Sequence, residues 1–108
     1  MFKLTPKPTF KAKVGLTMPG QEKQVEVTIE FKHLPRPQVK EFFETLEGKK
    51  DHEALGEIIV DWAGIVDDGA AVPFDSVALE TLCTNYPTAA ADLFVGFRKS
   101  FLESRAKN

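Results

Sequence analysis

The side chains in this sequence that could do chemistry are few and widely spaced. Two histidines, His33 and His52, have no second His at i+3 or i+4 and no Cys pair, the spacings that zinc sites use. The four aspartates between residues 61 and 75 lack the alternating pattern and the terminal Glu of an EF-hand calcium loop. We therefore predict no metal and no cofactor, and interpret the aspartates as turn formers, caps and solvated charge: Asp61, Asp67, Asp68 and Asp75.

Nucleophilic catalysis also lacks its constellation. Cys83 falls on the apolar stripe of a predicted helix with no activating base beside it, which is typical of a core residue. The run Gly48-Lys49-Lys50 lacks the upstream glycine and the following Ser or Thr of a phosphate-binding loop. No serine has the glycine flanks of a nucleophile elbow. The sequence predicts a protein that is not an enzyme, with no catalytic residues.

The totals fit one small folded domain. The chain has 108 residues, of which 43% are hydrophobic and 28% charged, and this is the composition of a globular protein. We expect one domain over residues 1–108, with residues 1–8 and 104–108 flexible. No window approaches a membrane span, and a single Cys excludes an internal disulfide. These features predict a cytoplasmic protein that does not associate with membranes.

Charge is distributed unevenly along the chain. Residues 1–40 contain eight Lys or Arg and three Glu, net +5, whereas residues 41–108 contain six Lys or Arg and thirteen Asp or Glu, net −7. The asymmetry indicates either two differently solvated faces or a charge-complementary head-to-tail stacking of copies. The net charge of −2 gives no basic field, so we predict no nucleic-acid partner.

The elements that position these residues begin with a predicted β-hairpin. Apolar and polar residues alternate over residues 10–16 and 25–31, and Met18-Pro19-Gly20-Gln21 between them fits a type II turn. Leu16 should face Val25, and the pairing then continues to Phe10 opposite Phe31. The predicted fold class is α+β: this antiparallel hairpin followed by about four helices in a mostly helical domain.

Four amphipathic patterns predict the helices. The first begins near Pro35 to Pro37 and ends at Gly48, and the second runs from Asp51 through Trp62. Residues 63–72 read as a loop. Asp75 should cap the third helix, which Pro87 ends, and Thr88 should cap the last. Core stripes of the two final helices are Ala78, Leu79, Leu82, Cys83 and Tyr86, then Ala90, Leu93, Phe94, Phe97 and Phe101.

The last helix has more apolar residues than one buried stripe requires. Ala91, Val95 and Leu102 lie about a quarter turn from the phenylalanine line and widen its apolar arc. Either the helix is buried on two sides by its own domain, or the arc contacts another protein. For the second case we predict Ala91, Val95 and Leu102, together with Phe101, as protein-binding residues.

Four segments together resemble a known family in their order along the chain. They are FKLTPKPTFKAKV, VTIEFKHL, EIIVDWAGI and PFDSVALETLCTNYPTAAADLFVGF. Their combination resembles the tail assembly chaperones of long, non-contractile-tailed bacteriophages and their prophages. One departure is Pro35, which stands where the family usually has a small capping residue such as Ser or Thr.

The resemblance implies a non-enzymatic protein that is absent from the finished virion. It implies binding to the tape measure protein, which the chaperone keeps soluble, recruitment of tail tube (major tail) protein subunits, and self-association. It also implies a longer product made by ribosomal frameshifting near Ala106-Lys107-Asn108. Two rival hypotheses are a small regulatory or adaptor domain of another kind, and an enzyme accessory domain or minimal enzyme.

Overall fold

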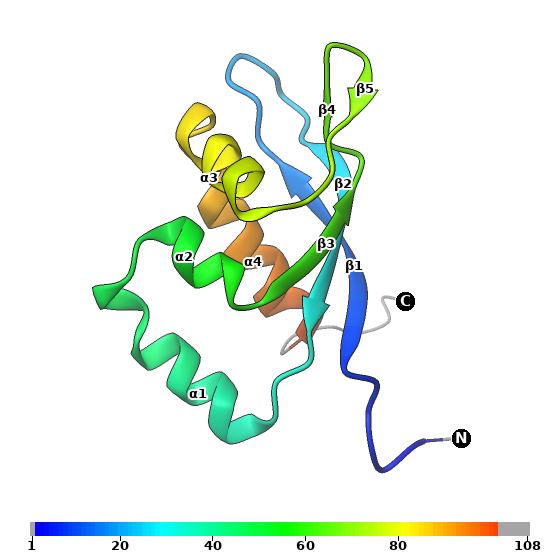
Figure 1. Cartoon of the computed structure of the whole chain (residues 1–108), viewed down its shortest axis with the longest axis vertical. Coiled ribbons are helices and arrows are strands. Elements are labelled where there is room, and N and C mark those ends of the chain that lie inside the picture. Colours follow the sequence, from blue (N-terminus) through cyan, green and yellow to red (C-terminus); the bar gives the residue numbers. More distant parts are fainter. Residues whose placement is uncertain (1, 102–108) are drawn as a thin grey trace.

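A computed structural model of the chain describes residues 2–101, with side chains as far as Ser100. Three strands form one antiparallel sheet in the order β1-β2-β3, and the helices lie against one face of it (Figure 1). This confirms the α+β class. The elements are β1 Thr9–Leu16, β2 Val25–Lys32, α1 Arg36–Glu44, a 3-10 turn η1 Leu46–Gly48, α2 Asp51–Gly56, β3 Ile59–Ala63, β4 Val66–Asp67, β5 Ala70–Ala71, α3 Ser76–Asn85 and α4 Ala89–Phe101.

The hairpin has the predicted register. Leu16 pairs with Val25 and Phe10 with Phe31, so the apolar side chains of both strands point to the helices. The type II turn is also as predicted, because Gln21 donates its backbone N–H to the Met18 carbonyl at 3.1 Å and Gly20 has a φ of +83°. Alternation and turn chemistry together specify this register.

The second predicted helix is wrong in its second half. α2 ends at Gly56, and the chain then enters a third strand that pairs with β2. A register shift between Glu30 and Phe31 leaves Val60 as an extra residue, so that Ile59 and Trp62 both point to the core. This β-bulge produces the i, i+3 spacing that resembles a helix. The β-branched run from Ile58 to Val60 favours the strand.

The predicted loop over residues 63–72 contains a second, shorter hairpin. Val66 pairs with Ala71 and Asp67 with Ala70. Asp68 and Gly69 between them have φ values of +49° and +79°, the positive angles that a type I′ turn requires. In Figure 1 this hairpin projects beside the turn that joins β1 to β2.

The last helices begin where the sequence predicts. Asp75 caps α3 by accepting the backbone N–H of Ala78 at 2.7 Å, and α4 starts directly after Thr88. α1 begins after Pro35 as expected, although a 3-10 turn replaces its last part. Of the expected flexible ends, residues 2–8 have exposed side chains and form no helix or strand, and residues 104–108 lie outside the described residues.

The core lies between the sheet and α4. Phe97 is fully buried, with its ring centroid 5.2 Å from that of Phe31 and 6.0 Å from that of Phe42. Gly96 allows the close approach of α4 to the sheet, since a Cβ there would lie 2.6 Å from Cγ2 of Val14. The aromatic cluster therefore joins β2, α1 and α4, and the outer side of α4 is left for solvent or partners.

Candidate protein interaction surface

No metal centre is formed in the part of the chain that the structure describes. Among residues 2–100, no group of three or more His, Cys, Asp and Glu side chains lies close enough to hold an ion. His33 follows β2 and His52 lies in α2, where its Nε2 is 3.9 Å from Oε2 of Glu80. The aspartates serve local structure instead: Asp75 caps α3, and Asp68 forms the β4–β5 turn.

Cys83 packs against the core from α3 and is only partly exposed. Burial, and secondarily the charge of Asp51, raises the pKa of its thiol from 9.0 to about 11. The thiolate is the reactive form of cysteine, so the thiol stays protonated and unreactive near neutral pH. The structure places Cys83 among the core residues, as the sequence indicates.

The predicted arc on α4 is exposed where it can be described. Val95 is 52% exposed and Ala91 is also exposed, while Leu93 and Phe97 on the opposite side are fully buried. α4 thus has apolar residues on two opposite sides, one buried in the core and the other exposed. The other two predicted residues fall outside this description: Leu102 is beyond the described residues, and the side chain of Phe101 is not described.

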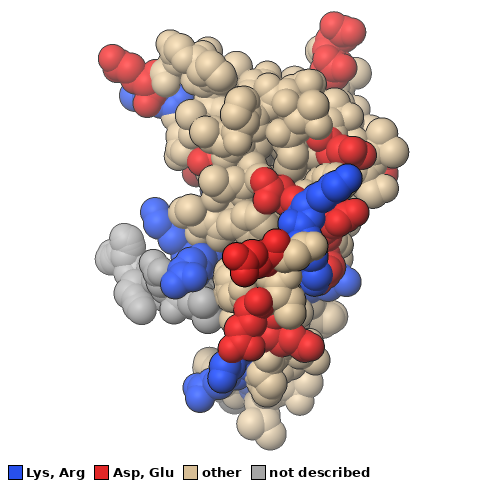
Figure 2. Space-filling view, turned by 90° about the vertical axis from the view of Figure 1, so that its left-hand side faces the viewer, with Lys and Arg blue, Asp and Glu red and all other residues tan. Residues whose placement is uncertain are grey.

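α3 also exposes an apolar side chain. Val77 is 70% exposed, and Glu80 is the only charged residue between Ser76 and Ala91. Figure 2 shows the upper part of this side of the molecule, where α3 lies, largely free of charged residues, whereas acidic and basic residues intermingle below it. Sequence reasoning missed Val77 because it lies off the core stripe of α3. The available signal was the low charge of this stretch, which has only Glu80 among sixteen residues.

An apolar groove of about 210 Å³ lies at the end of the molecule that carries the two hairpin turns. Its walls come from β1, β2, the β4–β5 hairpin, α3 and the start of α4. Val25 and Val66 are exposed at 43% and 63%. The lining residues are Leu16, Thr17, Met18, Val25, Val27, Gly64, Ile65, Val66, Leu82, Tyr86 and Ala89.

Asp92 holds one wall of this groove in place. Its Oδ2 accepts the backbone N–H of Thr17 at 2.8 Å, and its Oδ1 lies 3.5 Å from Nε2 of Gln24, which also donates to the Thr17 hydroxyl at 3.0 Å. The end of the β1–β2 hairpin is thereby attached to α4. A hydrogen bond to a charged group is among the stronger kinds, so this wall is well positioned.

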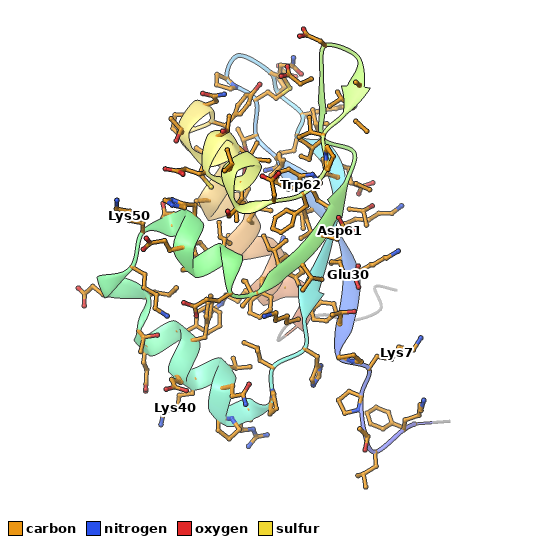
Figure 3. The ribbon with its side chains drawn as sticks, in the orientation of Figure 1. Lys7, Glu30, Lys40, Lys50, Asp61 and Trp62 are labelled. Atoms are coloured by element: carbon orange, nitrogen blue, oxygen red, sulfur yellow. The ribbon has the colours of Figure 1, made fainter. Side chains whose placement is uncertain are left out.

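The opposite face of the sheet is polar. Figure 3 shows Glu30 and Asp61 on the side away from the helices, and Trp62 on the side toward them. Thr9 donates its hydroxyl to Oε2 of Glu30 at 2.6 Å, and Nζ of Lys13 lies 3.9 Å from Oε1 of Glu26. Paired charges of both signs indicate a solvated surface, so this face of the sheet offers no apolar contact region comparable to the helices and the groove.

Comparison with protein families gives one match. The model of the phage tail assembly chaperone family matches residues 1–108, which is the whole sequence. The chain belongs to the phage tail assembly chaperone family. Searches of the curated proteins and of the solved structures give no match.

Family membership gives the tail assembly chaperone its broad role. The family has a role in phage tail assembly, and membership implies protein partners and a non-enzymatic role. This favours a chaperone over a regulatory adaptor or an enzyme accessory domain. Within the described residues, no helix has the length and apolar character needed to cross a membrane.

Pro35 of this tail assembly chaperone precedes α1 at the position where the family usually has a small capping residue. This proline occupies the N-cap of α1 with a φ of −60° and a ψ of 157°, and it makes no side-chain hydrogen bond to the helix. Its carbonyl accepts the N–H groups of Gln38 and Val39 at 2.9 and 3.0 Å. The helix therefore starts at the expected place without a capping side chain.

Proposed function

We propose that this chaperone binds the tape measure protein, keeps it soluble in the host cytoplasm, and helps to recruit tail tube subunits around it. In this proposal it is absent from the mature virion and self-associates head to tail. The observation that carries the proposal is the exposure of Val77 on α3 and of Ala91 and Val95 on α4, with Glu80 as the single charged residue between Ser76 and Ala91.

The chemistry of this surface suits a holding function. Burying apolar side chains against a partner lowers the free energy of the complex, and this stabilisation does not depend on a specific hydrogen-bond geometry. The stretch from Ser76 to Ala91, with one charged residue over sixteen positions, also imposes little desolvation cost on an apolar partner. Such a surface can hold successive apolar segments of a long chain.

The test is co-expression of the tape measure protein with variants of the chaperone. Ala91→Asp with Val95→Asp should leave the tape measure protein in the insoluble fraction, because two carboxylates would then face its apolar segments. Adding Leu102→Asp tests the third predicted residue of the arc. The matched control is Val60→Asp, a valine 37% exposed on β3, away from this surface.

Thermal unfolding of each variant separates binding from folding. The proposal expects near-normal stability of the α4 variants, loss of tape measure solubility with them, and full solubility with the control. An α4 variant that folds and solubilises the tape measure protein as well as the original chain would contradict this location for the binding surface.

A further inference from the structure

The segment before β1 exposes two large apolar side chains completely. Phe2 is 100% exposed and Leu4 is 98% exposed, more than any other large hydrophobic residue that the structure describes. We call residues 2–8 the arm. It leaves the domain at the end opposite the two hairpin turns (Figure 1), and Lys7 on it points away from the domain (Figure 3).

The arm forms no helix or strand, bends at Leu4 and Thr5, and is partly stiff. Pro6 and Pro8 fix two of its φ angles and disfavour helical conformations in the residues before them. A segment whose backbone is restricted in this way loses less conformational entropy when it binds. Its composition is apolar and basic: Phe2 and Leu4 alternate with Lys3, and Lys7 follows.

The apolar groove offers the complementary chemistry at the other end of the molecule. Val25 and Val66 on its walls are exposed, and its volume of about 210 Å³ suits one or two side chains of this kind. Asp67 and Asp68 directly follow Val66 at its edge, and neither forms an ion pair with another described residue. Lys3 and Lys7 are likewise without an ion pair among residues 2–100.

The arm of a chain is too short to place both Phe2 and Leu4 in that chain's own groove. His33 donates its backbone N–H to the Pro8 carbonyl at 2.9 Å, which keeps Pro8 in line with β1. The nearest strand residues of the groove lie at the level of Val14, which pairs with Val27. That level is six residues beyond Pro8, about 20 Å, whereas Leu4 is four residues before it, about 13 Å. A reversed arm would therefore bring Phe2, six residues before Pro8, only to the edge of the groove and leave Leu4 outside it.

We propose that the arm of one copy docks in the groove of a second copy. Phe2 and Leu4 enter the groove between the two hairpin turns and the α3–α4 junction, and the arm's lysines lie beside Asp67 and Asp68 of the second copy. The two contacting surfaces differ and lie at opposite ends, so the interface is heterologous and builds a ring or an open array.

This inference deepens the self-association in the proposed function and gives it a location. It is independent of the tape measure surface on α3 and α4, because no residue of the arm belongs to that surface and the exposed groove valines lie on the hairpins. The two proposals can therefore fail separately.

The experiment uses sedimentation velocity on the full chain over a wide range of concentrations. An arm variant carries Phe2→Ser and Leu4→Ser, and a groove variant carries Val66→Arg, which replaces an apolar contact and repels the arm's lysines. The matched control is Val60→Arg, an exposed valine on β3 that lies outside both the groove and the proposed tape measure surface. Circular dichroism checks folding, and Val25→Arg on the β2 wall replaces the groove variant should Val66→Arg unfold the chain.

The original chain and the control should grow in size with concentration, and less so at high salt because the ion pairs are screened. The arm and groove variants should each associate at least about tenfold more weakly, as loss of a central apolar anchor produces. Mixed in equal amounts, they should form a dimer and nothing larger, since one retains a good arm and the other a good groove.

A mixture that stays monomeric, or an original chain that is monomeric at every concentration, would overturn the proposal. Unchanged association of either variant would do the same. Tape measure solubilisation is measured in parallel and should persist in both variants. If Val66→Arg instead abolishes solubilisation by a monomeric protein, the groove belongs to the tape measure protein and not to the arm.

Discussion

Helices α3 and α4 both have apolar residues at helical spacing, but they bury them to very different extents. α4 places Ala89, Ala90, Leu93 and Phe97 in the core, whereas Leu79 is the only fully buried residue of α3. Leu82 and Cys83 on α3 are partly exposed, and Val77 is 70% exposed. Apolar periodicity therefore predicts that a helix packs somewhere, but not how deeply.

The difference follows from what each helix packs against. α4 crosses β1 directly and contacts the aromatic cluster, whereas α3 packs mainly on α2 and to a smaller extent on α4. α4 thus stabilises the domain, and α3 contributes more to its surface. Substitutions of the buried residues of α4 should therefore affect stability strongly, and those on the exposed side of α3 should affect it weakly.

The largest effect is expected at the centre of α4. Phe97→Ala removes a fully buried ring that contacts Phe31 and Phe42, and should lower the free energy of unfolding by about 3–5 kcal/mol. Urea denaturation followed by circular dichroism measures it. A loss below about 1 kcal/mol would show that α4 is not the main support of the core.

The next effect tests the close approach of α4 to the sheet. Gly96→Ala improves helix propensity by about 1 kcal/mol. The added Cβ would lie 2.6 Å from Cγ2 of Val14, and such overpacking costs about 1–3 kcal/mol. We expect a net loss of stability.

A double-mutant cycle identifies the cause at Gly96. Combined with Val14→Ala, which removes both contacting methyl groups, Gly96→Ala should no longer destabilise the chain. Simple additivity of the two changes would place the cost elsewhere.

The cap of α3 should have a smaller effect. Asp75→Ala removes the acceptor for the Ala78 N–H and should cost about 1 kcal/mol. Asp75→Asn keeps an acceptor oxygen and serves as the control, with a smaller expected loss. Equal losses in the two variants would indicate that the charge and not the hydrogen bond stabilises this end of α3.

The thiol of α3 gives a prediction that depends on pH. Because its folded pKa is raised to about 11, Cys83 should react with iodoacetamide at pH 8 at least about tenfold more slowly in the folded chain than in urea. The unfolded chain releases this proton first, so its contribution lowers stability as the pH rises from about 9 to about 11. Equal reaction rates would mean that α3 leaves the thiol in water.

The smallest effect is expected on the outer side of α3. Val77→Asp should change the free energy of unfolding by no more than about 0.5 kcal/mol, because the side chain is exposed and an acidic residue suits the first turn of a helix. Thermal unfolding measures it, with Leu79→Asp as the contrasting buried site. A large loss at Val77 would remove the contrast between the two helices.

Local patterns predicted the parts of the fold that local interactions specify. The β1–β2 register follows from strict alternation and a Pro-Gly turn, and the start of α3 follows from Asp75. β3 was missed because the bulge at Val60 gives a strand helical spacing. The β4–β5 hairpin was missed although Asp68-Gly69 is a strong turn signal, because only two residue pairs follow it.

The candidate surfaces divide in the same way. Ala91 and Val95 are exposed as the helical arc predicted, and whether they bind a partner stays a prediction. The groove could not be predicted, because its walls come from five elements between Leu16 and Ala89. The role of Asp92 depends on a contact 75 residues away along the chain, which no periodicity reveals.

That contact between Asp92 and Thr17 has a consequence for synthesis. The ribosome delivers the β1–β2 hairpin early and α4 late, so the hairpin end stays unattached until most of the chain has been translated. A nascent chain therefore has an arm before it has a groove. If the proposed contact forms and several copies are translated from one messenger, the arm of each new chain can dock in the groove of a finished neighbour before its own groove has formed. Assembly would then have a direction from the start.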